Sequence, residues 1–389
     1  MTLKVAKRGR VAPFIVMDVL RAANARAAAG ADVLHLEMGQ PATGAPKGVI
    51  AAARRMLESD PLGYTESQGL IALRQRIAAY YRRTQGVDVD PERIVVTTGA
   101  SGGFVLGFLA GFEPGDRVAL ADPGYPAYRN ILTGLGVEPV GLPAGPETRF
   151  QPSVALLEQA GKLDGLIVAS PSNPTGTMLG PDELRALVDY CDARGIRLVS
   201  DEIYHGITYG APAVSALRFT DTAIVVNSFS KYFSMTGWRI GWMVLPNDEA
   251  FARAVECLAQ NLYISPPTLS QYAAAAAFDC TDELDANVAR YAENRRILLE
   301  EFPRAGLYRL APAEGAFYLY ANVRHLTDDS EEFCRRMLVE TDVAAAPGTD
   351  FDKSRGRGYV RFSFAGGTSD MTEAARRLNA WLPKAATRG

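Results

Sequence analysis

The chain has 389 residues, 48% hydrophobic and 22% charged, which is enough for a large buried core and predicts two packed units. Forty-one basic and 44 acidic residues leave a net charge of −3, so neither nucleic acid nor a membrane surface is expected as a partner, and Pro13 and Asp18 interrupt any apolar N-terminal segment. The four cysteines are widely spaced without a CxxC pair, which is typical of reduced thiols in a cytoplasmic protein.

Six short apolar runs recur between residues 94 and 245, and each is predicted to form a buried strand. They are Ile94–Thr98, Arg117–Ala121, Gly165–Ala169, Ile196–Ser200, Ala223–Asn227 and Ile240–Leu245. Helical patterns such as Gly103–Phe112 and Pro181–Arg194 lie between them. We expect each run to be followed by such a pattern. This alternation predicts an α/β fold with a mostly parallel central sheet and helices on both of its faces.

The pattern changes after about residue 279. A long charged helix is expected over Asp282–Phe302, followed by strands at Tyr308–Val323 and Tyr359–Phe364 and helices near Ser330–Glu340 and Asp370–Leu382. The first 45 residues contain no strand of the main sheet. We therefore expect a large domain over residues 46–279 and a smaller α+β domain made of residues 1–45, as an N-terminal arm, and 280–389.

Polar residues of several chemical types follow five of the predicted strands. They are Gly99-Ala-Ser101, Asp122-Pro-Gly-Tyr125, Ser170-Pro-Ser-Asn173, Asp201-Glu-Ile-Tyr204 and Ser228-Phe-Ser-Lys231. In parallel sheets, ligands bind beyond the carboxyl ends of the strands, so these five segments are expected to converge on one site. Turns that only ended strands would not need a lysine, an acid and two tyrosines.

Lys231 directly follows a buried strand, where an amine is costly unless it has a partner or a task. A Schiff base with a carbonyl cofactor is such a task. Asp201 ends a neighbouring strand and could pair with a protonated ring nitrogen, a contact worth on the order of 4 kcal/mol at 4 Å, or about three pKa units. Pyridoxal phosphate needs both groups. A helix N-cap is the alternative role for Asp201.

The same strand ends offer partners for the rest of that cofactor. Asn173 and Tyr204 could bind the ring hydroxyl, although an Asx-turn is an alternative role for Asn173. Tyr125 could stack on the ring. The phosphate would lie at the start of the helix that follows Gly99. The residues expected around it are Ala100, Ser101, Ser228, Ser230 and Arg239.

Arg361 is a single arginine in the apolar run Tyr-Val-Arg-Phe-Ser-Phe. A guanidinium in a buried strand is suited to bidentate binding of a substrate carboxylate. A salt bridge within the small domain is the alternative.

Taken in order, these motifs resemble those of the class I/II aminotransferases, which are fold type I pyridoxal-phosphate enzymes. The likeness extends from Gly39-Gln-Pro41 to Arg361, and its most specific parts are Ser-Asn-Pro-Thr-Gly at 172–176, Asp201-Glu-x-Tyr204 and Ser228-x-Ser-Lys-x-x-x-Met-x-Gly-x-Arg-x-Gly241. The resemblance implies that Lys231, Asp201 and Tyr204 are catalytic, and that the substrate is held by Gly39, Asn173 and Arg361. It also implies a homodimer in which Tyr64 reaches the partner's phosphate.

The resemblance implies a ping-pong transfer of an amino group between an L-amino acid and a 2-oxo acid. A C–S β-lyase of the same fold is the nearest alternative, since the cofactor motifs are shared. Some aspartate-specific relatives carry a lysine at the position of Ser101, which argues against aspartate as the donor by that route.

A serine hydrolase is a distant alternative, because Gly99-Ala-Ser101-Gly-Gly103 also fits G-x-S-x-G between a strand and a helix. That hypothesis leaves Lys231 and Arg361 without a role. No metal site is expected, because His35, His205 and His325 are dispersed along the chain.

Overall fold

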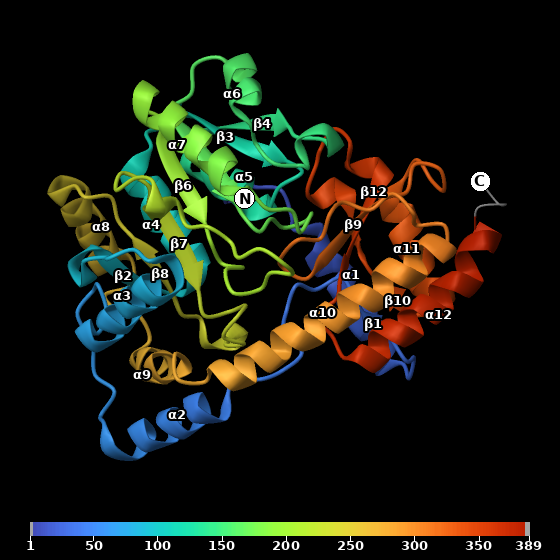
Figure 1. The fold of residues 1–389 in the computed structure, drawn as a ribbon, viewed down its shortest axis with the longest axis horizontal. Helices are drawn as coiled ribbons and strands as arrows, with labels where there is room; N and C mark the ends of the chain where they lie inside the picture. The colour runs from blue at the N-terminus through green and yellow to red at the C-terminus, as the bar shows by residue number, and fades with distance from the viewer. Residues whose placement is uncertain (1–2, 386–389) are drawn as a thin grey trace.

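A seven-stranded sheet forms the centre of the larger part of the molecule, in a computed structural model that describes residues 3–385 (Figure 1). The strand order is β2-β8-β7-β6-β5-β3-β4. The strands are β2 Ile94–Thr97, β3 Arg117–Asp122, β4 Glu138–Pro143, β5 Gly165–Ala169, β6 Arg197–Asp201, β7 Ile224–Ser228 and β8 Gly241–Val244. Only β8 is antiparallel to its neighbours, β2 and β7. The predicted mostly parallel sheet is therefore confirmed.

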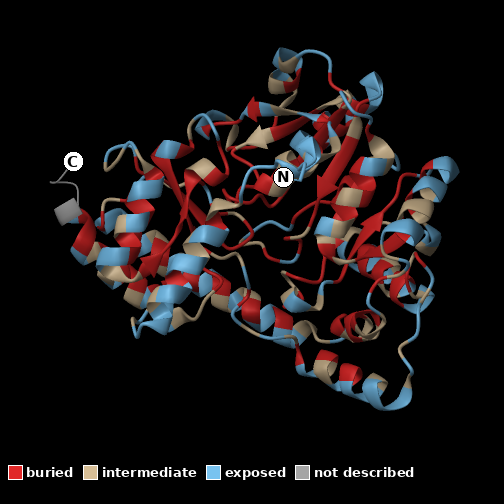
Figure 2. Cartoon of the chain, turned by 180° about the vertical axis from the view of Figure 1, so that it is seen from behind, coloured by how far each residue is buried: buried red, intermediate tan, exposed pale blue. Residues whose placement is uncertain are grey.

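Helices cover both faces of this sheet, and each face has its own apolar core. The helices of this part are α2 Lys47–Ser59, α3 Ile71–Gln85, α4 Gly99–Gly111, α5 Pro126–Leu135, α6 Val154–Ala160, α7 Pro181–Arg194, α8 Glu249–Leu262 and α9 Thr268–Ala277. Side chains of α3, α7 and α9 pack on one face and those of α4, α5 and α8 on the other. The strands β2, β5, β6, β7 and β8 are buried almost throughout, whereas the helices alternate between buried and exposed residues (Figure 2), as expected for amphipathic helices on a central sheet.

Two details of the main sheet differ from the prediction. No α-helix follows β6 or β7; each is followed by a loop with a single 3-10 turn, Ala216–Arg218 or Thr236–Trp238. The sequence pattern also missed β4, which pairs only with β3 at the edge of the sheet. An edge strand is half exposed and tolerates proline, so β4 lacks the apolar run that marks the central strands.

A second, smaller group of elements contains the three-stranded antiparallel sheet β11-β12-β9. Its strands are β9 Tyr318–Asn322, β11 Ala346–Pro347 and β12 Tyr359–Ser363, and its helices are α11 Ser330–Thr341 and α12 Thr368–Ala385. The predicted strand Tyr308–Val323 was too long, since β9 begins only at Tyr318. The long helix α10, Thr281–Arg304, runs from α9 to this group (Figure 1).

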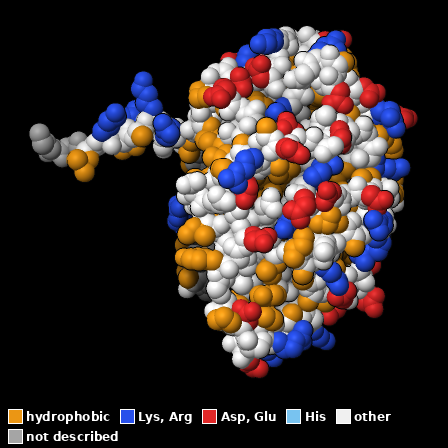
Figure 3. All heavy atoms as spheres, turned by 90° about the vertical axis from the view of Figure 1, so that its left-hand side faces the viewer, with side chains coloured by type: hydrophobic (Ala, Val, Ile, Leu, Met, Phe, Trp, Pro, Cys, Tyr) orange, Lys and Arg blue, Asp and Glu red, His pale blue; other side chains and the backbone are white. Residues whose placement is uncertain are grey.

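The N-terminal part of the chain packs with this smaller group. Helix α1, Ile15–Ala28, begins where the Asp350 carboxylate accepts hydrogen bonds from the amides of Ile15 and Val16, each at 3.1 Å. The short strand β1, Leu34–His35, pairs in parallel with β10, Val343–Ala344. Ahead of α1, a segment rich in lysine and arginine projects from the body (Figure 3). None of the helices within residues 3–385 has the length and apolar character needed to cross a membrane.

Candidate active site

The sheet topology brings the five polar segments to one edge. Because β8 is antiparallel to both β2 and β7, the strands β2, β3, β5, β6 and β7 all run in the same direction. Their carboxyl ends therefore lie on one side of the sheet, and Asp201 is directly paired with Ala169 of β5 and Val226 of β7. The residues that follow these strands form the floor of a common site.

Lys231 lies at this edge, in the turn after β7. Its Nζ donates a hydrogen bond of 2.7 Å to the carbonyl oxygen of Gly39 and lies 5.9 Å from the centre of the Tyr204 ring. Burial, and then the positive charges of Arg361 and Arg239, lower the pKa of the amine to about 8. An appreciable fraction of the amine is therefore neutral and nucleophilic near neutral pH.

Asp201 is only 3% exposed and stands at the end of β6. One carboxylate oxygen accepts a hydrogen bond from the amide of Ile203 at 3.1 Å, and the other accepts one from the Tyr128 hydroxyl. Burial raises the pKa of this carboxyl to about 7, and Lys231 opposes that shift. Within residues 3–385 no side chain forms a salt bridge with Asp201, so the site offers a buried acid to a cationic ligand.

Arg361 reaches the same site from β12. One guanidinium nitrogen donates to Oδ1 of Asn173 at 2.8 Å, and another donates to the carbonyl oxygen of Glu37. The guanidinium carbon lies 4.5 Å from the centre of the Tyr318 ring. Its Nε is buried and has no hydrogen-bond partner among the described residues. This unused donor leaves Arg361 able to bind an acceptor from a ligand.

Gly39 and two tyrosines close the space between Lys231 and Arg361. The hydroxyl groups of Tyr204 and Tyr318 are hydrogen-bonded at 2.7 Å. A Cβ atom on residue 39 would collide with the Tyr318 hydroxyl, so only glycine allows the chain to pass here. The Gly39 carbonyl is thereby held against the amine of Lys231.

Tyr125 forms an aromatic wall on the other side of the site. Its ring packs edge-on against Phe14 at 5.6 Å and against Tyr128 at 5.3 Å between centroids. Burial raises the pKa of Tyr125 to about 12, so its hydroxyl stays protonated. A narrow cavity separates Tyr125 from Asn173.

The start of α4 forms a cradle with Arg239. Gly99 has a left-handed φ of 76°, and a Cβ at this residue would lie 2.5 Å from the Arg239 guanidinium. Gly241 lets β8 approach closely, since its Cβ would lie 2.9 Å from the amide nitrogen of Ala100. The exposed Ser101 follows at the first turn of α4. Free backbone amides and a guanidinium together make a site for a phosphate.

Two buried serines complete that cradle. The Ser228 hydroxyl donates to the Ser230 hydroxyl at 3.0 Å and accepts a bond from the Ser230 amide at 3.0 Å. Arg239 is itself held in a left-handed conformation, with φ of 52°, and donates to the carbonyl of Thr236 at 2.9 Å. Its guanidinium therefore faces the start of α4.

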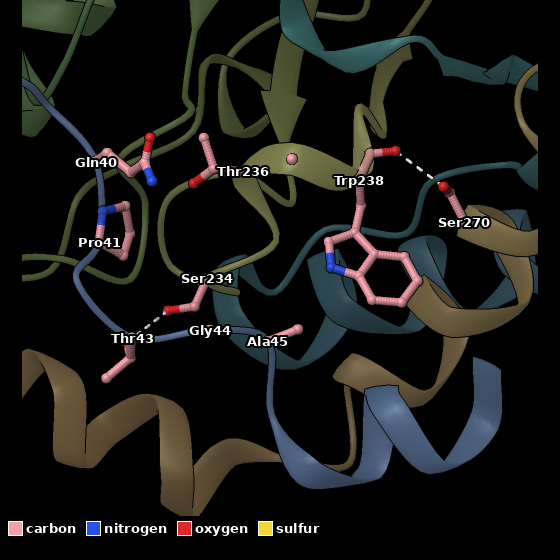
Figure 4. Close-up of a pocket in the computed structure, with 10 residues that line it drawn as sticks. Gln40, Pro41, Thr43, Gly44, Ala45, Ser234, Thr236, Trp238 and Ser270 are labelled. Atoms are coloured by element: carbon pink, nitrogen blue, oxygen red, sulfur yellow. Dashed lines mark hydrogen bonds between the residues drawn. The ribbon is translucent and has the colours of Figure 1, made fainter. Parts of the chain in front are cut away.

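A cavity of about 410 Å³ opens beside the Lys231 turn (Figure 4). Gln40, Pro41 and Thr43 line one side of it, directly after Gly39, and the turn from Ser234 to Trp238 lines the other. The Thr43 and Ser234 hydroxyls are 3.4 Å apart across its floor. This cavity gives the outer side of the Lys231 turn access to solvent.

Tyr64 stands apart from these residues. Its side chain is 82% exposed, in the loop between α2 and α3. That loop is fixed to the start of α9, where the Thr268 hydroxyl donates to the Gly63 carbonyl at 2.7 Å. Within one chain, Tyr64 points into solvent rather than toward Lys231.

Two contributors were missed by the sequence analysis. Tyr128 binds Asp201, and Tyr318 contacts both Tyr204 and Arg361. Tyr128 could have been found, because it lies three residues after Tyr125, the N-cap residue of α5, in the first turn of that helix. Tyr318 has no such signal, since an aromatic residue in an apolar strand is usually part of the core.

The residues present fit pyridoxal phosphate. A buried acid without a cation, an amine of lowered pKa and a cradle of amides and guanidinium all face one edge of the sheet. The oxygen of the Asn173 side chain is used by Arg361, which leaves its amide nitrogen free to donate to the ring hydroxyl.

The geometry does not support the serine hydrolase alternative. His205 is buried and its Nε2 contacts the carbonyl of Ser170 at 3.1 Å, whereas His325 contacts the carbonyl of Gly306 at 2.8 Å. Ser101 has no hydrogen bond to either histidine among the described residues.

Comparisons with known proteins agree with this site. The model of the family "Aminotransferase class I and II" matches residues 31–378. A valine–pyruvate aminotransferase of Mycobacterium tuberculosis is 52% identical over 388 residues, covering 98% of this chain and 100% of the relative. An aspartate aminotransferase of Thermotoga maritima is 34% identical over 364 residues, covering 91% of this chain and 92% of the relative.

Solved structures agree as well. A crystal structure of an aminotransferase from Mycobacterium tuberculosis, 52% identical, superimposes with a TM-score of 0.96 over 98% of this chain and 100% of that one. The structure of the aspartate aminotransferase of Thermus thermophilus with maleate is 30% identical. It superimposes with a TM-score of 0.91 over 97% of this chain and 100% of that one. The chain belongs to the class I and II aminotransferases and is a pyridoxal-phosphate-dependent enzyme that transfers amino groups between amino acids and 2-oxo acids.

Proposed function

We propose that the enzyme transfers the amino group of an L-amino acid with an apolar side chain to a small 2-oxo acid, in two half-reactions of a ping-pong cycle. Valine and pyruvate are the first pair to test, because they are the substrates in the name of the Mycobacterium tuberculosis relative. The aromatic wall of Phe14 and Tyr125 favours an apolar side chain. Ser101 stands where some aspartate-specific relatives have a lysine, which also argues against an acidic donor.

One observation carries this proposal: an amine of lowered pKa, Lys231, and a buried acid, Asp201, lie at adjacent strand ends. Bound pyridoxal phosphate supplies an electron sink that stabilises negative charge at the substrate α-carbon. The Asp201 carboxylate would keep the ring nitrogen protonated. Lys231 would hold the cofactor at its aldehyde, and its Nζ would accept the proton of the substrate α-carbon. Tyr204 and Asn173 would bind the ring hydroxyl, and Tyr125 would cover the ring.

The remaining roles follow from the charges on each side of the site. Arg361 and the backbone at Gly39 bind the α-carboxylate of the substrate, using the unpaired Nε of Arg361. The phosphate is bound by residues that share the cradle at the start of α4. They are Ala100, Ser101, Ser228, Ser230 and Arg239.

We also propose a homodimer with shared active sites, in which Tyr64 of each subunit completes the phosphate cradle of the other. Leu57, Tyr64, Leu262 and Ile264 are all at least half exposed, and the loops that carry Tyr64 and Ile264 are joined by a hydrogen bond from the Thr65 amide to the Ser265 hydroxyl at 3.4 Å. Such a group of apolar side chains is suited to burial between subunits. The expected cytoplasmic location and the division into residues 46–279 and residues 1–45 with 280–389 belong to the same proposal.

The test is a product assay with purified enzyme, added pyridoxal phosphate, valine and pyruvate. We expect alanine and the 2-oxo acid of valine in equal amounts. When pyruvate is omitted, the 2-oxo acid formed should not exceed one equivalent per enzyme subunit. A panel of other amino acids should then rank donors by side chain. Ammonia released without an acceptor, or pyruvate formed from a β-thio amino acid, would instead identify a C–S β-lyase.

A further inference from the structure

Glu202, within the motif Asp201-Glu-x-Tyr204, and His205, directly after it, have no role in the site described so far. Both are nearly inaccessible, at 1% and 3% exposure. They lie in the loop that leaves the end of β6. A carboxyl and an imidazole buried so close to the cofactor-binding edge are stable only if their charges and hydrogen bonds are satisfied, so the positions of their protons matter.

One oxygen of Glu202 is fully occupied. Its Oε1 accepts hydrogen bonds from the Ser200 hydroxyl at 3.2 Å, the Ser215 hydroxyl at 2.9 Å and the Ala216 amide at 3.0 Å. The other oxygen, Oε2, is buried and has no hydrogen-bond donor among the described residues. It faces Nδ1 of His205 at 3.5 Å.

The proton on His205 can be located from its other contact. Its Nε2 lies 3.1 Å from the carbonyl oxygen of Ser170, and a carbonyl can only accept, so Nε2 carries a hydrogen. In a neutral imidazole, Nδ1 is then an unprotonated acceptor. Two buried acceptors, Nδ1 and the ionised Oε2, would repel each other with no donor between them.

One further proton removes this conflict. We infer that Glu202 and His205 share a single proton between Oε2 and Nδ1, and that this uncharged pair positions the Asp201 and Tyr204 segment and keeps Asp201 the only anion at the ring nitrogen. The inference rests on the proposed role of Asp201.

Burial favours the uncharged pair. It raises the pKa of Glu202 to about 7 and lowers that of His205 to about 4. The proton therefore resides mainly on Glu202. The other titratable groups that sense the Glu202 charge are Tyr80 and Tyr81 of α3 and Asp201 of β6, and each has its pKa raised by it.

The pair is also connected to the ends of two strands. His205 is bonded to the carbonyl of Ser170, at the end of β5, and the Ser170 amide donates to the carbonyl of Asp201 at 3.4 Å. Ser170 begins the segment that carries Asn173. Glu202 and His205 thus act on the cofactor through Asp201 and Asn173, as positioning residues.

The first experiment locates the proton in the cofactor-free protein. The chain has only three histidines, so selective ¹³C and ¹⁵N labelling of the imidazoles gives few signals, and His205→Gln identifies the signal of His205. We expect the His205 shifts to stay constant between about pH 5 and 6, with Nε2 protonated, because burial lowers the pKa of His205 to about 4 and Glu202 keeps its proton in this range. A His205 that takes up a proton within this pH range, or one protonated on Nδ1 alone, would overturn the inference.

The second experiment tests the effect on Asp201. In the Lys231→Ala background, where the cofactor binds noncovalently, Glu202→Gln keeps a donor toward Nδ1 but cannot ionise. We expect equal affinity for pyridoxal phosphate at about pH 6, where Glu202 is uncharged in the Lys231→Ala protein, and an affinity that differs between the two variants by about threefold at about pH 8.5, where Glu202 is ionised and Gln is not. Identical pH dependence would overturn the inference. Absence of cofactor binding at every pH would instead contradict the proposed function, and the proton assignment would still stand on the first experiment.

Discussion

The two sides of the active site differ in how they are built. The side proposed for the cofactor ring is buried: Asp201, Tyr204 and Asn173 are each less than a tenth exposed. The side proposed for the phosphate is more open in the single chain: Ser101 and Arg239 are exposed, although Ser228 and Ser230 are buried. Burial shifts the pKa of reactive groups, whereas binding a phosphate needs only amides and a positive charge. Each side therefore has the solvent access that its chemistry requires.

This difference predicts different consequences for substitutions. A change on the buried side removes a group whose proton or charge is tuned by its surroundings, so the chemical step should suffer most. A change on the open side removes one of several contacts to a solvated anion, so cofactor affinity should fall by a smaller factor.

The largest effect is expected for Lys231→Ala. Without this amine, no group at the strand ends can hold the aldehyde covalently or move the α-proton, so turnover should fall by at least roughly 10³-fold. The measurements are the valine–pyruvate assay and the absorbance of the protein-bound cofactor.

Tyr232→Phe is the matched control for that variant. Its hydroxyl contacts Asp285 at 2.7 Å and lies outside the site, so activity should be retained. A Lys231→Ala enzyme with undiminished turnover would contradict the proposed mechanism.

Arg361→Ala should have the next largest effect, because it removes a buried bidentate hydrogen-bond donor from the substrate carboxylate. We expect substrate binding to weaken by about 2–5 kcal/mol, visible as a raised KM with a smaller change in kcat. Arg361→Lys keeps the positive charge but cannot form two parallel hydrogen bonds, so its effect on substrate binding should be intermediate. A falling Tm with an unchanged KM would show that Arg361 only links β12 to Asn173 and Glu37.

The contrast between the two sides also explains what the sequence could predict. Lys231 and Asp201 were recognisable because ionisable residues directly follow apolar strands, and the parallel sheet brings such ends together. The contact between Arg361 and Asn173 joins residues 188 positions apart, and no local pattern encodes it. Tyr318 is hidden for a different reason: it is 1% exposed in an apolar strand, like a core residue, although its hydroxyl contacts Tyr204 and its ring contacts Arg361. The edge strand β4 was missed because partial exposure removes its apolar pattern.

A moderate effect of pH is predicted for covalent uptake of the cofactor. Only the neutral amine of Lys231 is nucleophilic, and burial lowers its pKa from 10.5 to about 8. The uptake rate should therefore rise with pH and level off above about 8 rather than near 10.5. Stopped-flow mixing of cofactor-free protein with pyridoxal phosphate measures this profile. A midpoint near 10.5 would mean that the amine is solvated in the free enzyme.

The smallest effect is expected for Tyr64→Phe, which tests whether the open side is completed by a second subunit. Loss of one hydrogen bond to a charged phosphate should weaken cofactor affinity by about 1.5–3 kcal/mol while leaving the dimer intact. Equilibrium dialysis measures the affinity and sedimentation measures the dimer. The decisive control is a mixed dimer of Tyr64→Phe and Lys231→Ala subunits. If Tyr64 acts across the interface, the Lys231 that remains lies in a site completed by the unaltered tyrosine of the Lys231→Ala subunit, and that site should bind cofactor with wild-type affinity. If Tyr64 acts within its own chain, the same site should show the weakened affinity.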